Sequence, residues 1–168
     1  MDAGLIIARL VFGLLMAAHG TQKAFGWFGG YGLAGTGGFF EQLGFRPGRF
    51  FAAAAAASEV TAGILMAIGL LGPVGPALIV SVMLVAAATV HWQHGLFAQN
   101  NGIEMPLLYG VAAISLALTG FGAYSVDAAL GLTSLWTPTI VWGALTLGTV
   151  GGVANLALRR PVPQTVTA

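Results

Sequence analysis

The sequence predicts an all-α fold, an integral membrane helical bundle, and three observations carry this prediction. The 168 residues are 57% apolar and only 7% charged, with a mean hydropathy of +0.89. A soluble domain has about 25% charged residues, so a chain of this size could not cover its surface for water. The apolar residues also form continuous runs, unlike the alternating ten-residue segments of a membrane β-barrel.

Five apolar runs are long enough, or nearly so, to cross about 30 Å of hydrocarbon, which takes about 20 helical residues. They cover residues 4–22, 50–71, 75–92, 105–121 and 135–158. We expect the first four to form a four-helix core within residues 1–130, a fifth C-terminal transmembrane helix within 131–160, and a short flexible tail at 161–168.

The connection between the second and third runs contains two prolines and two glycines, at positions 72–76. Proline ends one helix and begins another, so this segment predicts a tight turn and an antiparallel hairpin.

The first loop differs from the apolar runs. Residues 27–32 are aromatic and glycine-rich, as expected at the level of the lipid headgroups. From Thr36 the chain can begin a short interfacial helix whose one face carries Phe39, Phe40 and Leu43. A simple soluble loop is the alternative.

Small residues mark places where helices can approach closely. Ala52 to Ala57 are six consecutive alanines, and Gly148 and Gly152 are four residues apart. Such a pair is typical of a helix-packing surface, here a seam between two copies of the chain, although glycine is common in membrane helices generally.

Composition excludes several classes of protein and site. A soluble enzyme and a disordered segment are excluded by the hydropathy, and a nucleic-acid binder by the net charge of +1. The absence of cysteine excludes disulfides, a thiol nucleophile and Cys-ligated zinc or iron–sulfur sites. The sequence gives no signal for a flavin or a nucleotide.

Basic residues predict an orientation. With five spans, Lys23, Arg46 and Arg49 in the first loop lie on the same side as Arg159 and Arg160. The positive-inside rule then puts this side in the cytoplasm and the N-terminus outside. We expect a multi-pass protein of a bacterial-type cell (inner) membrane.

Ionisable residues inside apolar spans are candidates for function because a charge near the bilayer centre costs several kcal/mol. Arg9, His19 and Lys23 fall within an arc of about 80° on the first helix. Glu59 lies near the middle of the second span, and the simplest expectation is that it forms an ion pair with Arg9. The pair could serve function or only helix packing. His19 and His91 could handle protons, contact a ligand or form structural hydrogen bonds.

A metal site has weaker support. His91 and His94 are three residues apart and Glu104 follows ten residues later, a set that can hold a metal. The spacing fixes no further ligand, and His19 with His91 as axial haem ligands is weaker still. We therefore expect no metal.

Five short motifs, in unbroken order from about Gly4 to Leu130, resemble the DoxX family. The first, at residues 19–26, resembles the family's HGxQKxFG, and the second, at 35–44, its GTxxFFxxLG. The others are Ser58–Gly63 with Glu59, then Thr89–His91 with 95–97 and 101–104, and Tyr124–Asp127. Ile103 departs from the family's usual aromatic residue, and the fifth run lies beyond its usual four-helix core.

The resemblance implies a compact four-helix membrane bundle. The family takes its name from a subunit of a thiosulfate:quinone oxidoreductase, and other members are linked to membrane-associated redox complexes. The polar residues that the resemblance carries over are Arg9, His19, Lys23, Glu59, His91 and Glu104.

These residues suggest a redox-associated subunit that binds a quinone-like carrier among its helices. His19 and Lys23 would donate to one quinone oxygen, Glu59 or His91 would handle protons, and Phe39 with Phe40 would form a lateral route from the lipid. Arg9 and Glu104 would complete the binding site.

The alternative is a non-enzymatic membrane scaffold that recruits soluble redox partner subunits. A transporter is less favoured, because the sequence lacks an obvious inverted repeat. Expected partners are the lipid bilayer, soluble redox subunits and a second copy of the chain in a homo-oligomer.

Overall fold

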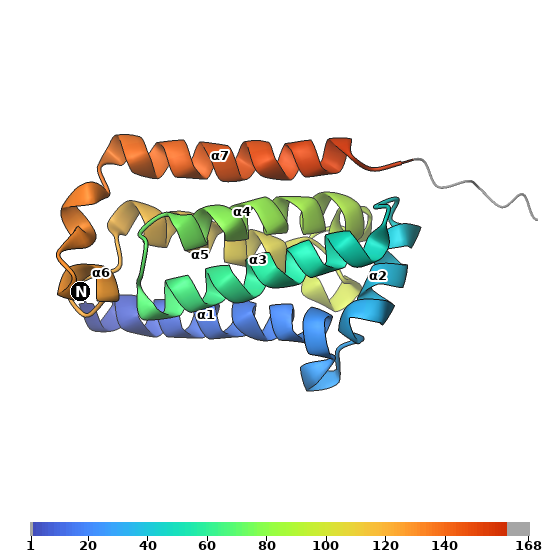
Figure 1. Ribbon diagram of the computed structural model, residues 1–168, viewed down its shortest axis with the longest axis horizontal. Coiled ribbons are helices and arrows are strands. Elements are labelled where there is room, and N and C mark those ends of the chain that lie inside the picture. Colours follow the sequence, from blue (N-terminus) through green and yellow to red (C-terminus); the bar gives the residue numbers. More distant parts are fainter. Residues whose placement is uncertain (1, 161–168) are drawn as a thin grey trace, which may run out of the picture.

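The computed structural model describes residues 2–160, which contain helices and no β-strand. The long helices are α1 (Asp2–Phe25), α3 (Gly48–Ile68), α4 (Val74–Ala86), α5 (Glu104–Thr119) and α7 (Pro138–Ala157), and the short ones are α2 (Gly32–Gln42) and α6 (Val126–Ala129). The long helices lie side by side, with α1 and α7 on opposite sides and α3 and α4 between them (Figure 1). The predicted all-α membrane bundle is confirmed. The tail predicted at 161–168 lies outside the described residues.

Four helices in the described part of the chain are long and apolar enough to cross a membrane: Asp2–Phe25, Gly48–Ile68, Val74–His94 and Pro138–Ala157. The fourth predicted run becomes the shorter α5, whose 16 residues span about 24 Å. It nevertheless packs along α4 and returns the chain toward the opposite end of the bundle (Figure 1). The turn at Gly69–Pro73 makes α3 and α4 the expected antiparallel hairpin.

Glycines set the register between α1 and α3. A Cβ at Gly13 would lie 2.7 Å from the Gly63 carbonyl oxygen, and one at Gly20 would lie 2.8 Å from the Ala56 oxygen. Only a residue without a side chain lets the two backbones approach this closely. The antiparallel register that results places Arg9 beside Gly69, the residue that follows the last residue of α3.

The glycine pair on α7 packs within the chain. A Cβ at Gly152 would lie 2.9 Å from the Ser81 carbonyl oxygen, and Gly148 lies against Ala77. Both partners belong to α4, so the surface suggested as a seam between two copies is the α4–α7 contact of a single chain.

The helix that begins with α4 changes its winding before it ends. Ala87–His91 form a π-helical turn and Trp92–His94 a 3₁₀ turn. A π turn holds one more residue than an α turn, and such turns occur frequently at functional sites. His91 is the last residue of this one.

The helix of the first loop begins earlier than predicted. It starts at Gly32 rather than Thr36, and Thr36 lies inside it, 6% exposed. Gly32 has a φ of 64°, which suits the turn that precedes the helix. At the other end, a Glu41 carboxylate oxygen accepts a hydrogen bond from the Gly48 N–H, 3.1 Å away, which ties α2 to the start of α3.

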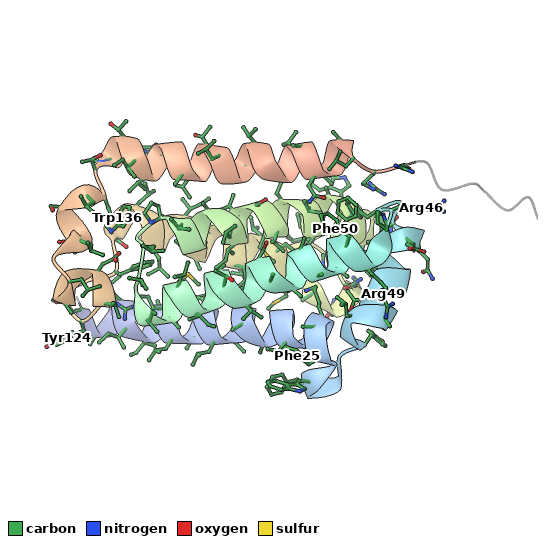
Figure 2. The ribbon with its side chains drawn as sticks, in the orientation of Figure 1. Phe25, Arg46, Arg49, Phe50, Tyr124 and Trp136 are labelled. Carbon is green, nitrogen blue, oxygen red and sulfur yellow. The ribbon has the colours of Figure 1, made fainter. Side chains whose placement is uncertain are left out.

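The two basic clusters lie at the same end of the bundle. Arg159 donates from Nε to the Leu43 carbonyl over 2.8 Å, and the Arg160 N–H donates to the Gly44 carbonyl over 2.9 Å. Arg46 and Arg49 project at this end, to the right in Figure 2. The end of α7 is thereby fixed to the loop between α2 and α3.

Candidate functional site

A cavity of about 270 Å³ lies at the end of the bundle where α2 covers the long helices. Its walls come from α1, α2, α3, α4 with its π turn, and α7. Five of the residues predicted for a site line it: Lys23, Phe39, Phe40, Glu59 and His91. The structure thus brings together, from four separate elements, residues up to 68 positions apart in the sequence.

The charged group of the cavity is an ion pair between Lys23 and Glu59. Lys23 Nζ lies 2.6 Å from Glu59 Oε2 and 2.8 Å from Oε1. The Glu59 side chain is 2% exposed and that of Lys23 is 27% exposed. Burial of the carboxylate is tolerated because the ammonium group satisfies both of its oxygens.

The predicted pairing of Arg9 with Glu59 is wrong. The register of α1 on α3 puts Arg9 beside Gly69, ten residues and about 15 Å along the helix from Glu59. The Arg9 guanidinium, 3% exposed, instead donates to the backbone carbonyls of Phe121, Ala67 and Tyr124. Within residues 2–160 its Nε has no hydrogen-bond partner.

His91 is oriented by a backbone contact. Its Nδ1 lies 2.7 Å from the Asn101 carbonyl oxygen. A carbonyl oxygen can only accept, so Nδ1 carries the hydrogen in this contact. In neutral His91 the other ring nitrogen, Nε2, is then an acceptor, and it becomes a donor when the ring is protonated.

Aromatic rings form the apolar part of the cavity wall. Phe40 and Phe45 have ring centroids 5.9 Å apart, and Phe45 and Phe51 5.3 Å apart, within the range of favourable aromatic pairs. Phe45 is only 2% exposed, whereas Phe39 is 43% exposed. The rings therefore run from the buried loop after α2 to the outer surface of that helix.

A second hollow lies outside the first. This groove, about 600 Å³, runs between the end of α1, the turn at Gly29–Tyr31 and α2. Lys23, Phe39 and Phe40 line both the groove and the cavity. These three side chains therefore separate a space near the surface from the one that holds Glu59.

Three other predicted site residues do not line the cavity. Arg9 lies toward the far end of the bundle. His19 Nδ1 is 3.0 Å from Gln22 Oε1, and its ring packs edge-on against Tyr109 of α5. Glu104, at the start of α5, accepts a hydrogen bond from the Ala98 N–H over 2.7 Å and so organises the preceding loop.

Sequence reasoning missed cavity residues from the loop after α2, from α3 and from the last helix. Phe45, Phe51, Ser58 and Asn155 all line it. Asn155 is the one amide side chain within the apolar run of 135–158. Its presence in an otherwise apolar helix was the signal in the sequence that could have identified it.

Comparison with known proteins gives one match. The model of the DoxX family matches residues 4–92, just over half of the chain. Neither a curated protein nor a solved structure matches the chain significantly. The matched range contains all of the cavity residues named above except Asn155.

Proposed function

The chain belongs to the DoxX family, and on that premise we propose that it is a redox-associated membrane subunit that binds a quinone-like carrier in the cavity at Lys23 and Glu59. The observation that carries the proposal is a buried ion pair in a cavity otherwise walled largely by aromatic and aliphatic side chains. Ligand sites in proteins have this composition, a mainly apolar wall with a few convergent polar groups.

The residues of the cavity fit a quinone ring. Its volume of about 270 Å³ lies just below the usual range of roughly 300–1,000 Å³ for drug-sized ligands, which suits a single substituted ring. Phe45 and Phe51 offer aromatic faces for stacking. The outer groove would hold an apolar tail, because it adjoins the cavity across the side chains of Phe39 and Phe40, which line both.

The polar residues have separate roles in this proposal. Lys23 Nζ donates a hydrogen bond to a ring oxygen while it remains close to the Glu59 carboxylate. Glu59 accepts or releases a proton, and its 2% exposure keeps that proton from bulk water. His91 Nδ1 connects the cavity wall to the loop at Asn101, which leaves Nε2 as the ring nitrogen that can exchange a proton. A bound quinone would supply two-electron, two-proton redox chemistry.

Native mass spectrometry of the protein purified in mild detergent tests this proposal. We expect the wild type to retain a quinone-sized molecule in a one-to-one ratio, and Lys23→Met to lose it. Arg46→Gln is the matched control, because it removes a cation at the same end of the bundle without touching the cavity. Equal retention by wild type and Lys23→Met would refute binding at the ion pair.

The second candidate is the scaffold that recruits soluble redox subunits. One observation favours it: the end of α1 and the turn after it present Phe25, Trp27, Phe28 and Tyr31, each at least 57% exposed. Phe25 projects away from the bundle in Figure 2. Partners that co-purify with the wild type but not with Trp27→Ser/Phe28→Ser, together with the absence of any bound carrier, would favour this role.

A further inference from the structure

The last helix contributes a polar group to the cavity from the side opposite to Lys23. Asn155 lies in α7, outside the family match, yet lines the cavity together with Lys23 and Glu59. Because α1 packs on α3 and α7 packs on α4, α1 and α7 lie on opposite sides of the bundle (Figure 1). A ligand between them would have the ion pair at one edge and Asn155 at the other.

Contacts on both sides of Asn155 hold it in place. One turn before it, Gly152 packs against the Ser81 backbone. Just after it, Arg159 and Arg160 are hydrogen-bonded to the loop carbonyls of Leu43 and Gly44. The Arg159 guanidinium also lies 5.8 Å from the centre of the Phe45 ring, which is part of the cavity wall.

The Asn155 amide is available to a ligand. Among residues 2–160 its side chain makes no hydrogen bond, although an amide offers two donors and an acceptor. The residue is half-buried, so neither its donors nor its acceptor must be released from another protein group before they bind a ligand oxygen. The neighbouring cavity walls offer mainly alanine and valine, at positions 54, 55, 82, 85 and 86, together with the hydroxyls of Ser58, Ser81 and Thr89. The Thr89 hydroxyl already donates to the Val85 carbonyl.

We propose that Asn155 determines specificity: its amide N–H donates to the second oxygen of a ring whose first oxygen binds at Lys23. The ligand class is then a ring with oxygen acceptors on opposite edges, rather than one with a single oxygen. This inference rests on the proposed function, since it refines what the same cavity binds.

The test compares a bicyclic probe with two opposed oxygens, 1,4-naphthoquinone, and one with a single oxygen and a saturated C2–C4 segment, 1-tetralone, by equilibrium binding to the full chain in lipid nanodiscs. We expect the wild type to bind the quinone five- to tenfold more tightly than the ketone, since one neutral hydrogen bond contributes a factor of this size. Asn155→Leu should abolish that preference by weakening quinone binding while leaving ketone binding unchanged.

Two further variants make the result decisive. Asn155→Ala removes the amide without adding bulk and should reproduce the loss. Thr146→Val changes another polar side chain of α7 that does not line the cavity, and should bind like the wild type.

The possible failures are distinguishable. A wild type that binds neither probe would overturn the proposed function and this inference with it. A wild type that binds the quinone, with Asn155→Leu and Asn155→Ala unchanged in affinity and preference, would overturn the role of Asn155 and leave the proposed function standing.

Discussion

Two basic residues of α1 illustrate how single side chains are accommodated in this bundle. Lys23 neutralises a buried carboxylate, whereas Arg9 has backbone carbonyls as its only hydrogen-bond partners in the described chain. The first arrangement joins α1 to α3 through opposite charges. The second joins α1 to the segment after α5 through a planar group with several donors.

Removing Lys23 should destabilise the protein more than removing Glu59. Lys23→Met leaves the Glu59 carboxylate buried and unpaired, which costs about 3–5 kcal/mol. Glu59→Gln costs less, because the lysine side chain is 27% exposed and can move its ammonium group toward water. The double variant should recover much of the loss from Lys23→Met. Unfolding in detergent measures all three, and additive losses would show that the pair is not coupled.

Replacing Arg9 by a residue that keeps only its positive charge should destabilise the protein. Arg9→Lys retains the cation but cannot reach the carbonyls of Phe121, Ala67 and Tyr124 together, so we expect a loss of about 2–4 kcal/mol. Hydrogen exchange should rise at residues 121–127. Arg9→Lys and Glu59→Gln should be additive, because the two side chains do not meet. If the two losses of stability were not additive, Arg9 and Glu59 would interact, which would contradict the structure.

Sequence reasoning identified the right residue types but paired them incorrectly. Lys23, Glu59, His91, Phe39 and Phe40 were all expected near a site, because charged and aromatic residues interrupt apolar runs there. Which cation meets Glu59 depends on the register between two helices. That register is set by backbone contact at glycines, and charge spacing along one helix carries no information about it.

At the scale of elements, the closest packing in the bundle relies on residues without side chains. A Cβ at Gly63 would lie 2.5 Å from both the Ala17 nitrogen and the Gly13 oxygen, whereas one at Gly110 of α5 would meet nothing within 4 Å. Two glycines in similar apolar helices thus have opposite environments. Long helices and their turns were predictable from apolar runs and prolines, but this difference was not.

Gly63→Ala should therefore destabilise the bundle while Gly110→Ala does not. The added methyl group forces α1 and α3 apart, and overpacking of this kind typically costs about 1–3 kcal/mol. Gly110→Ala adds the same methyl group in open space and should be neutral or slightly stabilising. Melting temperatures in one detergent compare the two, and equal shifts would show that the α1–α3 contact is not tight.

The whole molecule is polarised in charge. Lys23, Arg46, Arg49, Arg159 and Arg160 lie at the end covered by α2, whereas the described opposite end carries Asp2, Asp127 and a single basic residue, the buried Arg9. The hydrogen bonds of Arg159 and Arg160 to the α2–α3 loop confirm that the two basic clusters share one end.

This polarity predicts the orientation in the membrane. By the positive-inside rule the basic end faces the cytoplasm, and five passes put the N-terminus on the other side. A reporter fused to the C-terminus should be active only if it works in the cytoplasm, and one fused to the N-terminus only if it works outside. The double substitution Arg159→Glu/Arg160→Glu should weaken the preference for a cytoplasmic C-terminus. A C-terminal reporter active only outside would contradict both the count and the orientation.

The π turn at Ala87–His91 holds one residue more than an α turn, so its five residues turn the helix about as far as four residues of an α-helix. Deleting Ala87 or Ala88 would therefore let the segment wind as an ordinary α-helix with His91 close to its present direction. If the same five residues wound as an α-helix, His91 would instead turn by about 100°, away from Asn101 and the cavity. The π turn thus lets the chain carry an additional residue while the imidazole keeps its place in the wall.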